Sequence, residues 1–481
     1  MQSFPLLLYQ SVQRLISYLH KYFLAIYILI YYICENITKN VFMIISFSVR
    51  NCLSFKERQS FQLIAAPIRE RFDSFIENKF TVREGLDLLK SAVLYGANAS
   101  GKSNFIKALS FFRQFVLTSA ILSLEKEITQ IPFFLNTKTR ISPSEFEVTF
   151  FRDKRIYRYG FIVSRKAVIE EWLYIKDLRE TMVFERKEDK IDIPEKHEIL
   201  KDLRDKRMIR SNALLLSVAA QFNDEIPKTI FDWFVNMNII QGMADLLYNE
   251  FSLNMLNDPN FRETITSLLK AADPGIEELK ITETEGENIA LTKKGSDISN
   301  PSVSKNKSVI RHLLSIKLVN TDKGTAETKA EYPFEIFESE GTKKFFHLSG
   351  PILDTLKHGR ILLVDELDTK LHPLLTKKIV SLFNNNKTNP NNAQLIFATH
   401  DLNLLDAKIF RRDQIWFTEK LKDGSTDLFS LLDFKKGKTP RNDEKLSKNY
   451  SLGKYGAVPY LADIDMVMEE FSRYNVRKKK S

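Results

Sequence analysis

Lys102 and Ser103 are the residues of this chain whose types and spacing point most directly to chemistry. They end the segment Gly96-Ala97-Asn98-Ala99-Ser100-Gly101-Lys102-Ser103, which fits the pattern G-x-x-x-x-G-K-[ST] at every fixed position. In such a loop the glycines let backbone N–H groups surround phosphates, the lysine reaches the β- and γ-phosphates, and the hydroxyl binds Mg²⁺. We therefore expect ATP and Mg²⁺ as cofactors, held by Gly96–Ser103 between a strand and a helix.

Polar residues that suit phosphate chemistry also follow two apolar strands further along the chain. The run Ile361–Val364 ends in Asp365 and Glu366, and Gln394–Thr399 ends in His400. Two carboxylates at the end of a buried strand need a cation nearby. We expect Asp365 to hold Mg²⁺, directly or through water, and Glu366 to polarise the attacking water as a general base. His400 is placed to reach the γ-phosphate.

Together these three elements resemble the ABC-type ATPase superfamily, whose heads close in pairs over ATP. The resemblance implies a fourth element, a Ser-x-Gly signature at a helix N-terminus, where free N–H groups and the helix dipole bind the γ-phosphate of the partner's ATP. Leu348-Ser349-Gly350 looks more like the family motif, but Pro351 follows it at once. Ser339 and Gly341 leave room for a helix of about four turns before the next strand. We choose Ser339 and Gly341, although Pro351 then lies inside that helix.

A closer resemblance, over roughly residues 43–465, is to the bacterial abortive-infection and restriction-linked ATPases of the RloA/AbiLi type. It rests on these motifs: Met43–Asn51 followed by Ser54-Phe55-Lys56, the phosphate loop extended to Asn104, Glu340-Gly341-Thr342, Asp365–Asp368 with Leu371-His372-Pro373, and Tyr455–Tyr460. His372 replaces the Asp of transporter subunits, which favours the SMC/RecF and OLD-like branch. The resemblance adds Asn104 to the nucleotide-binding residues.

The resemblance also implies a role and partners. Such proteins act in phage defence beside a separately encoded effector, often a Toprim-like nuclease, and no nuclease motif occurs in this chain. The first hypothesis is therefore an ATP-hydrolysing sensor or regulator of anti-phage defence that works as a homodimer or higher homo-oligomer. The second is a RecF-like ATPase of DNA repair or chromosome maintenance. The third is a scaffold that binds ATP without turnover, against which the intact Glu366 argues.

The charge and cysteine content restrict the partners and the compartment. The chain has 71 lysines and arginines against 61 acidic residues, a formal net charge of +10. This excess suits a polyanion such as DNA, which remains a candidate partner, but a lysine-rich solvated surface explains it equally well. Two cysteines, Cys34 and Cys52, are too few to stabilise a chain of 481 residues through disulfide bonds, so we expect a reducing, cytoplasmic location.

The first residues form an unusual leader. Tyr22–Cys34 is a run of 13 uncharged, mostly apolar residues. It is shorter than the roughly 20 residues that span a bilayer, so a membrane role is not expected. It is either a short membrane-associating or buried helix, or part of a leader outside the folded core. We prefer the second interpretation, because regular strand alternation begins only at Ile44.

The alternation of strands and helices predicts an α/β fold. The resemblance implies that this fold is a P-loop NTPase head of the ABC/SMC type. We expect a mixed sheet with flanking helices, an antiparallel β lobe and a mainly helical insert. The expected segments are a leader over 1–42, the first part of the head over 43–186, the insert over 187–330, the second part of the head over 331–430, and a C-terminal tail region over 431–481. The sequence does not place a Gln loop firmly, and Gln130 is only a weak candidate.

Overall fold

The computed structural model describes residues 42–68, 73–123, 125–241, 245–273, 275–292, 302–320, 327–405, 408–434, 444–458 and 468. The expected leader therefore lies outside the described residues, except for Phe42. Phe42 is buried, and its N–H donates to the Gly359 carbonyl at 3.3 Å, so the head starts at least one residue earlier than expected. Within the described part of the chain, no helix is long and apolar enough to cross a membrane.

A six-stranded sheet forms the centre of the head, with the strand order β11-β15-β16-β5-β17-β18. All neighbouring strands are parallel except β17 and β18, which pair antiparallel. The strands are β5 (Ser91–Gly96), β11 (Met237–Ile240), β15 (Ile361–Val364), β16 (Gln394–Ala398), β17 (Ile415–Lys420) and β18 (Thr426–Ser430). The expected α/β fold with a mixed sheet is thus confirmed.

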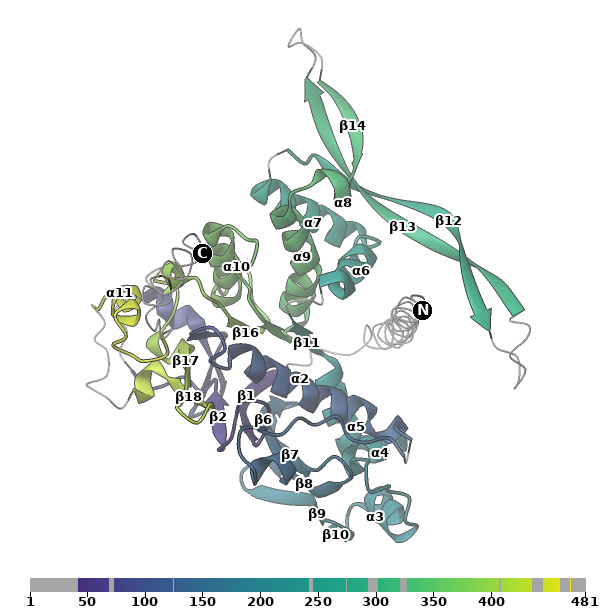
Figure 1. Ribbon diagram of the computed structural model, residues 1–481, viewed down its shortest axis with the longest axis vertical. Coiled ribbons are helices and arrows are strands. Elements are labelled where there is room, and N and C mark those ends of the chain that lie inside the picture. Colours follow the sequence, from purple (N-terminus) through teal and green to yellow (C-terminus); the bar gives the residue numbers. More distant parts are fainter. Residues whose placement is uncertain are drawn as a thin grey trace, which may run out of the picture.

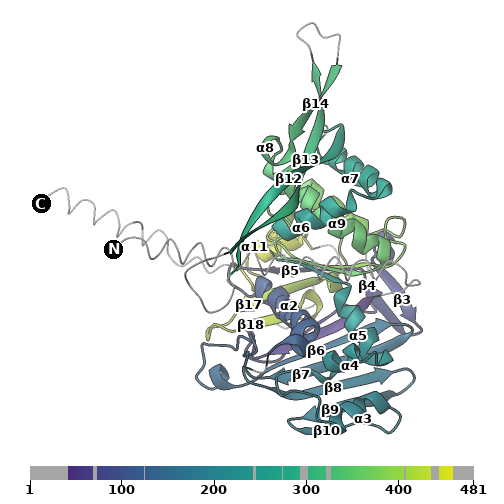
Figure 2. The same ribbon diagram turned by 90° about the vertical axis from the view of Figure 1, so that its right-hand side faces the viewer.

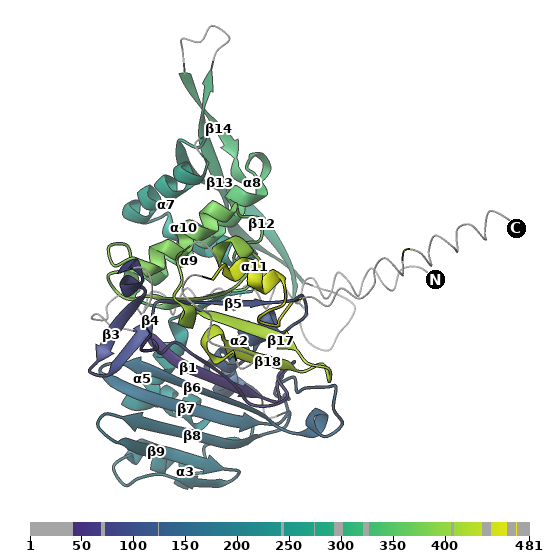
Figure 3. The same cartoon turned by 90° about the vertical axis from the view of Figure 1, so that its left-hand side faces the viewer.

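Both faces of this sheet are covered, and successive side chains point to opposite faces. Ala92 and Leu94 of β5 enter a hydrophobic core shared with helix α2 (Lys102–Thr118), whereas Val93 and Tyr95 enter a second core. The second core contains helices α9 (Glu340–His358) and α10 (Pro373–Asn384). Figure 3 shows α2 on one side of the sheet and these two helices on the other.

A seven-stranded antiparallel sheet forms the β lobe, in the order β10-β9-β8-β7-β6-β1-β2. Its strands are β1 (Met43–Arg50), β2 (Gln59–Gln62), β6 (Ser144–Arg152), β7 (Arg155–Val163), β8 (Val168–Lys176), β9 (Glu180–Lys187) and β10 (Lys190–Asp192). A small hairpin of β3 (Lys79–Arg83) and β4 (Leu86–Leu89) follows β2 in the chain. The lobe packs on α2 and on three short helices, α3 (Glu198–Asp205), α4 (Leu215–Gln221) and α5 (Glu225–Val235) (Figure 2).

The segment 187–330 differs from the expected helical insert. Its first half contains α3, α4 and α5, then β11 of the central sheet, then α6 (Asp245–Met255) and α7 (Pro259–Ala272). Its second half is strand, a three-stranded antiparallel sheet of β12 (Glu278–Thr292), β13 (Ser302–Asn320) and β14 (Glu327–Pro333). The alternation that begins at Leu279 and Ile281 has the period of a strand, and that signal outweighs helix propensity here.

We call the sheet of β12, β13 and β14 the arm, because it stands away from the head (Figure 1). The polar, Ser- and Asn-rich stretch 295–307 is typical of a loop in sequence, but Ser302–Lys307 belongs to β13, and 295–301 lies outside the described residues. The segment Tyr332–Phe337 looks like a strand in sequence, but β14 ends at Pro333, and Phe334–Phe337 forms the short helix α8. The arm therefore leads through α8 directly into α9.

The first described part of the expected C-terminal tail belongs to the head instead. Helix α11 (Leu446–Ser451) places Tyr450 against Phe417 of β17, with ring centroids 5.5 Å apart. Tyr455 packs on the same Phe417 at 5.8 Å, and both tyrosines are buried. Residues 444–458 thus complete the second hydrophobic core beside the central sheet.

Candidate nucleotide-binding site

The phosphate loop lies between β5 and α2, as the motif predicts. Ala99 and Gly101 have φ angles of 60° and 118°, so the chain turns sharply before α2 begins at Lys102. The Lys102 ammonium donates to the carbonyl oxygens of Gly96 at 2.8 Å and Ala97 at 3.1 Å, folding back over the loop. This brings the lysine and the free N–H groups at the start of α2 together, as phosphate binding requires.

Two threonines from distant strands shape the loop. A Cβ atom added at Gly96 would lie 2.3 Å from the Thr418 hydroxyl, and one added at Gly101 would lie 2.3 Å from the Thr426 hydroxyl. The same hydroxyls hold Ser100: Thr418 lies 2.6 Å from its Oγ, and Thr426 donates to its carbonyl at 2.7 Å. The two glycines are therefore required by these contacts as well as by phosphates. The sequence analysis missed both threonines, since no motif marks them.

Asn104 follows the loop on α2 and was expected to contact the nucleotide. Its side-chain amide donates to the Ser54 hydroxyl at 2.8 Å, and Ser54 in turn lies 2.7 Å from the Thr426 hydroxyl. Asn104 thus ties α2 to the turn between β1 and β2. The contact with nucleotide remains a prediction.

The expected Mg²⁺ ligands lie side by side. Ser103 Oγ donates to Asp365 Oδ1 at 3.1 Å, although the two residues are 262 positions apart. Burial raises the pKa of Asp365, and the Ser103 hydrogen bond opposes this effect. Burial also lowers the pKa of Lys102 to about 8, against the Asp365 and Glu366 charges. A hydroxyl and a carboxylate are oxygen ligands that Mg²⁺ prefers, so the residues fit this ion.

Glu366 and His400 extend this edge of the sheet. Glu366 has a φ of 54°, and its carboxylate accepts a hydrogen bond from the Thr369 hydroxyl at 3.2 Å. The backbone N–H of His400 donates to the Asp368 carboxylate at 3.3 Å, which links the ends of β15 and β16. The pKa of His400 is lowered by its partial burial and by the Lys102 ammonium. The structure thus brings Glu366 and His400 to the side of the phosphate loop.

The structure indicates a better Gln-loop candidate than Gln130. Gln130 is buried, and its side-chain carbonyl accepts from the Ser144 hydroxyl of β6 at 2.9 Å, which ties it to the β lobe. Gln241 instead follows β11, whose last carbonyl, that of Ile240, accepts from the Asp365 N–H at 2.9 Å. The sequence signal for Gln241 is that a polar residue follows a short apolar strand, as Asp365 and His400 also do.

The two signature candidates lie at very different places on α9. Ser339 is the N-cap of this helix, and its hydroxyl accepts from the Thr342 N–H at 3.1 Å. Ser349 lies inside the helix, is fully buried, and donates to the Phe346 carbonyl. A Cβ atom at Gly341 would lie 2.8 Å from the Lys370 carbonyl, so the helix start closely approaches the loop after β15. Of the two serines, only Ser339 is at a helix N-terminus, and its role as signature remains a prediction.

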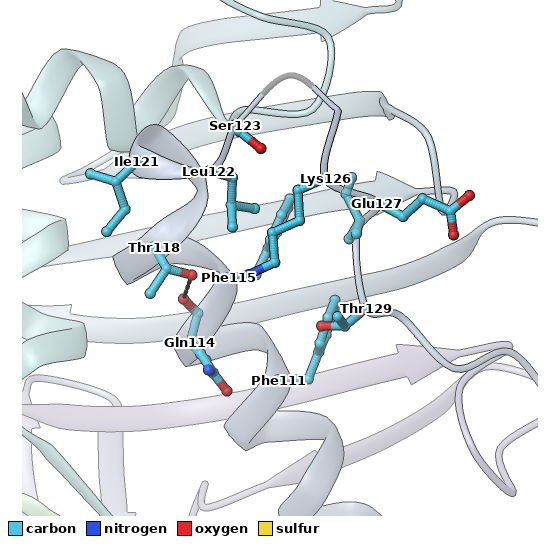
Figure 4. Close-up of a pocket in the computed structure, with 11 residues that line it drawn as sticks. Phe111, Gln114, Phe115, Thr118, Ile121, Leu122, Ser123, Lys126, Glu127 and Thr129 are labelled. Carbon is cyan, nitrogen blue, oxygen red and sulfur yellow. Dashed lines mark hydrogen bonds between the residues drawn. The ribbon is translucent and has the colours of Figure 1, made fainter. Parts of the chain in front are cut away.

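A separate pocket of about 320 Å³ lies at the other end of α2. Figure 4 shows it between the last turns of the helix, including Gln114 and Thr118, and the segment that carries Lys126. The residues of α2 that line this pocket begin at Phe111, about 14 Å along the helix from Lys102. The pocket is therefore not part of the nucleotide site.

This fold and these motifs define an ABC/SMC-like P-loop ATPase. Residues 91–406 match the family described as "AAA domain, putative AbiEii toxin, Type IV TA system", and this is more than half of the chain. The chain therefore belongs to this AAA family. None of the curated proteins compared with it is similar in sequence.

Several solved structures are similar to this chain at low identity. One is the Smc head bound to the C-winged helix domain of ScpA, with 14% identity, a TM-score of 0.40, and coverage of 80% of this chain and 97% of that chain. Another is the SMC head domain from Thermotoga maritima, with 11% identity, a TM-score of 0.36, and coverage of 80% and 98%. A third is the recombination mediator RecF with ATP, with 13% identity, a TM-score of 0.30, and coverage of 82% and 100%.

Proposed function

We propose that this protein binds and hydrolyses ATP between the heads of two identical subunits. The observation that supports this most directly is the contact between Ser103 and Asp365 beside Lys102. It joins the phosphate loop to the strand end that carries Glu366. A protein that only bound ATP would have no need of a carboxylate at the position of Glu366.

Each residue of the site has a role in this proposal. Lys102 and the N–H groups at the start of α2 would bind the phosphates, while Ser103, Asp365 and the side-chain oxygen of Gln241 would hold Mg²⁺. When bound, the ion neutralises charge on the phosphate oxygens. Glu366 accepts the proton of the attacking water, and the hydroxyl of Thr369 orients the Glu366 carboxylate.

The second head completes the site. His400 reaches the γ-phosphate from its own chain, and Ser339 with Gly341 caps it from the partner. ATP would therefore close the pair, and hydrolysis would open it again. This arrangement makes the protein a homodimer, or a larger homo-oligomer, whose state depends on the nucleotide.

The biological role that we propose is a sensor or regulator of anti-phage defence, beside a separately encoded effector such as a Toprim-like nuclease. The family description, which names an AbiEii toxin of a type IV toxin–antitoxin system, supports a role of this kind. RecF-like DNA maintenance is the alternative, and the net charge of +10 favours it.

The test is ATP hydrolysis by the purified chain, with and without DNA. We expect turnover that a Lys102→Ala chain lacks, while its circular dichroism stays unchanged. Normal turnover by folded Lys102→Ala would refute the assigned site. Strong stimulation by DNA would favour the RecF-like role. Protection of cells against phage that depends on both Lys102 and a neighbouring effector gene would favour the defence role.

A further inference from the structure

The arm meets the start of α9 at a buried carboxylate. Glu338 lies between α8 and Ser339, and only 5% of it is exposed. Its carboxylate accepts from the Ser315 hydroxyl at 2.5 Å and pairs with the Lys317 ammonium at 3.0 Å. Both partners belong to β13, the central strand of the arm. The residue directly before the helix N-cap is thus bound to the arm.

Separating the Glu338 carboxylate from Ser315 and Lys317 would cost free energy. A buried carboxylate without its partners is strongly unfavourable, so Glu338 must follow any movement of β13. The root of the arm is held to the head by Arg311, which bonds to Glu250 and to Asn254 of α6, the latter at 2.7 Å. The rest of the arm projects beyond the head in Figures 1 and 2. A force on the projecting part therefore acts on the head through this root.

The first turn of α9 is held from two sides. The Thr342 hydroxyl donates to the Asp273 carboxylate after α7 at 3.2 Å, and Lys370 pairs with Glu340 at 3.0 Å. Asp273 belongs to the segment that leads from α7 into the arm, whereas Lys370 belongs to the loop after β15. The turn that follows Ser339 is thus bonded on one side to the segment that leads into the arm and on the other side to the loop after β15.

We infer that Glu338 is a positioning residue that couples the arm to the signature turn. This inference rests on the proposed function, in which Ser339 and Gly341 cap the partner's ATP. The pair of Glu338 and Lys317 sets the direction of the α9 N-terminus, and displacement of β13 by a bound partner changes it. The arm thereby controls turnover without touching the nucleotide.

Glu338→Gln tests this coupling, with Glu331→Gln as the matched control. Glu331 lies on β14 of the same arm and pairs with Lys280 of β12 at 2.7 Å, but both side chains are exposed. The amide that replaces Glu338 keeps an acceptor for Ser315 and loses only the ion pair. Because hydrogen bonds to charged groups have large effects, we expect turnover per chain to fall about ten- to a hundredfold. The control should stay within about twofold of wild type.

The decisive readout separates turnover from nucleotide binding. Binding of a fluorescent ATP analogue, measured at protein concentrations too low for pairing, should not change in Glu338→Gln, because the hydrogen bonds of Glu338 go to the arm and not to the phosphate loop. Lost turnover with unchanged single-chain affinity supports the coupling. Unchanged turnover, or a parallel loss of single-chain affinity, overturns it. If wild type itself hydrolyses no ATP, the proposed function fails rather than the coupling.

A second pair of variants covers the case in which Glu338→Gln does not fold. Lys317 is about one-quarter exposed, so Lys317→Met changes a partly exposed side chain and leaves Glu338 with the Ser315 hydrogen bond and with water as a possible partner. This variant should lose turnover as Glu338→Gln does, and Lys317→Arg, which keeps the charge, should recover it. Equal turnover in Lys317→Met and Lys317→Arg would overturn the coupling.

Discussion

The affinity for ATP should depend on pH through Lys102. Burial lowers the pKa of this group to about 8. Only the ammonium form attracts phosphates, so affinity is full well below pH 8 and is lost as the pH rises through this value. The charged fraction is about nine-tenths at pH 7, one-half at pH 8 and one-tenth at pH 9. We therefore expect about tenfold weaker binding at pH 9 than at pH 7, or about 1.4 kcal/mol.

The assay is binding of a fluorescent ATP analogue between about pH 7 and pH 9.5 in the Glu366→Gln chain, so that no turnover interferes. Lys90 supplies the control, because burial also lowers its pKa to about 8, yet it directly precedes β5, at the end opposite the phosphate loop. Lys90→Met should keep the pH profile of the parent chain. A constant affinity over this range, or loss of the profile in Lys90→Met, would refute the reasoning.

Two predictions concern the pairing of heads. Glu366→Gln should bind ATP and stop hydrolysis, because an amide cannot accept the proton, with a loss of about 10²–10⁴-fold in rate, and pairs should accumulate. Size-exclusion chromatography with and without ATP checks this, and an unchanged elution volume would argue against closure of two heads. Mixing Gly341→Asp chains with Lys102→Ala chains should restore part of the activity that each lacks, since one intact site forms per mixed pair. No recovery from folded, associating chains, or an inactive Ser349 variant beside an active Ser339 variant, would contradict the assignment of the signature.

The phosphate loop and the strand before it could be predicted from the sequence because they are local. The pattern Gly96–Ser103 fixes its own backbone through glycines and the start of a helix, and the strand β5 and helix α2 flank it as expected. The same holds for Asp365 and His400 at the ends of apolar strands. The room needed for a helix before β15 favoured Ser339 over Ser349 as the residue at the helix start, and Ser339 is indeed the N-cap of α9.

The expectation of a mainly helical insert was wrong for the second half of the segment, which forms the arm, and the reason is again physical. The arm has few apolar residues that pack on the head, among them Leu279, Leu313 and Ile316, and charged and polar residues surround them, so the strand period extends over only a short stretch of sequence. Long antiparallel pairing between β12 and β13 stabilises these strands through backbone hydrogen bonds that no single segment encodes. Gln241, the proposed Gln-loop residue, was not singled out in the sequence because β11 has only four residues, and the place of this strand beside β15 is decided by the sheet.

By itself, then, the sequence determined the groups that the proposed site uses: a phosphate-loop motif, a carboxylate pair and a histidine, each set by residues near one another in the chain. Only the tertiary structure decided what surrounds them. Thr418 and Thr426 hold Ser100 of the loop from 318 and 326 residues away, and Glu338 ties the start of α9 to the arm. Such contacts depend on which elements lie side by side, and that is settled by the packing of the whole head and not by any local pattern.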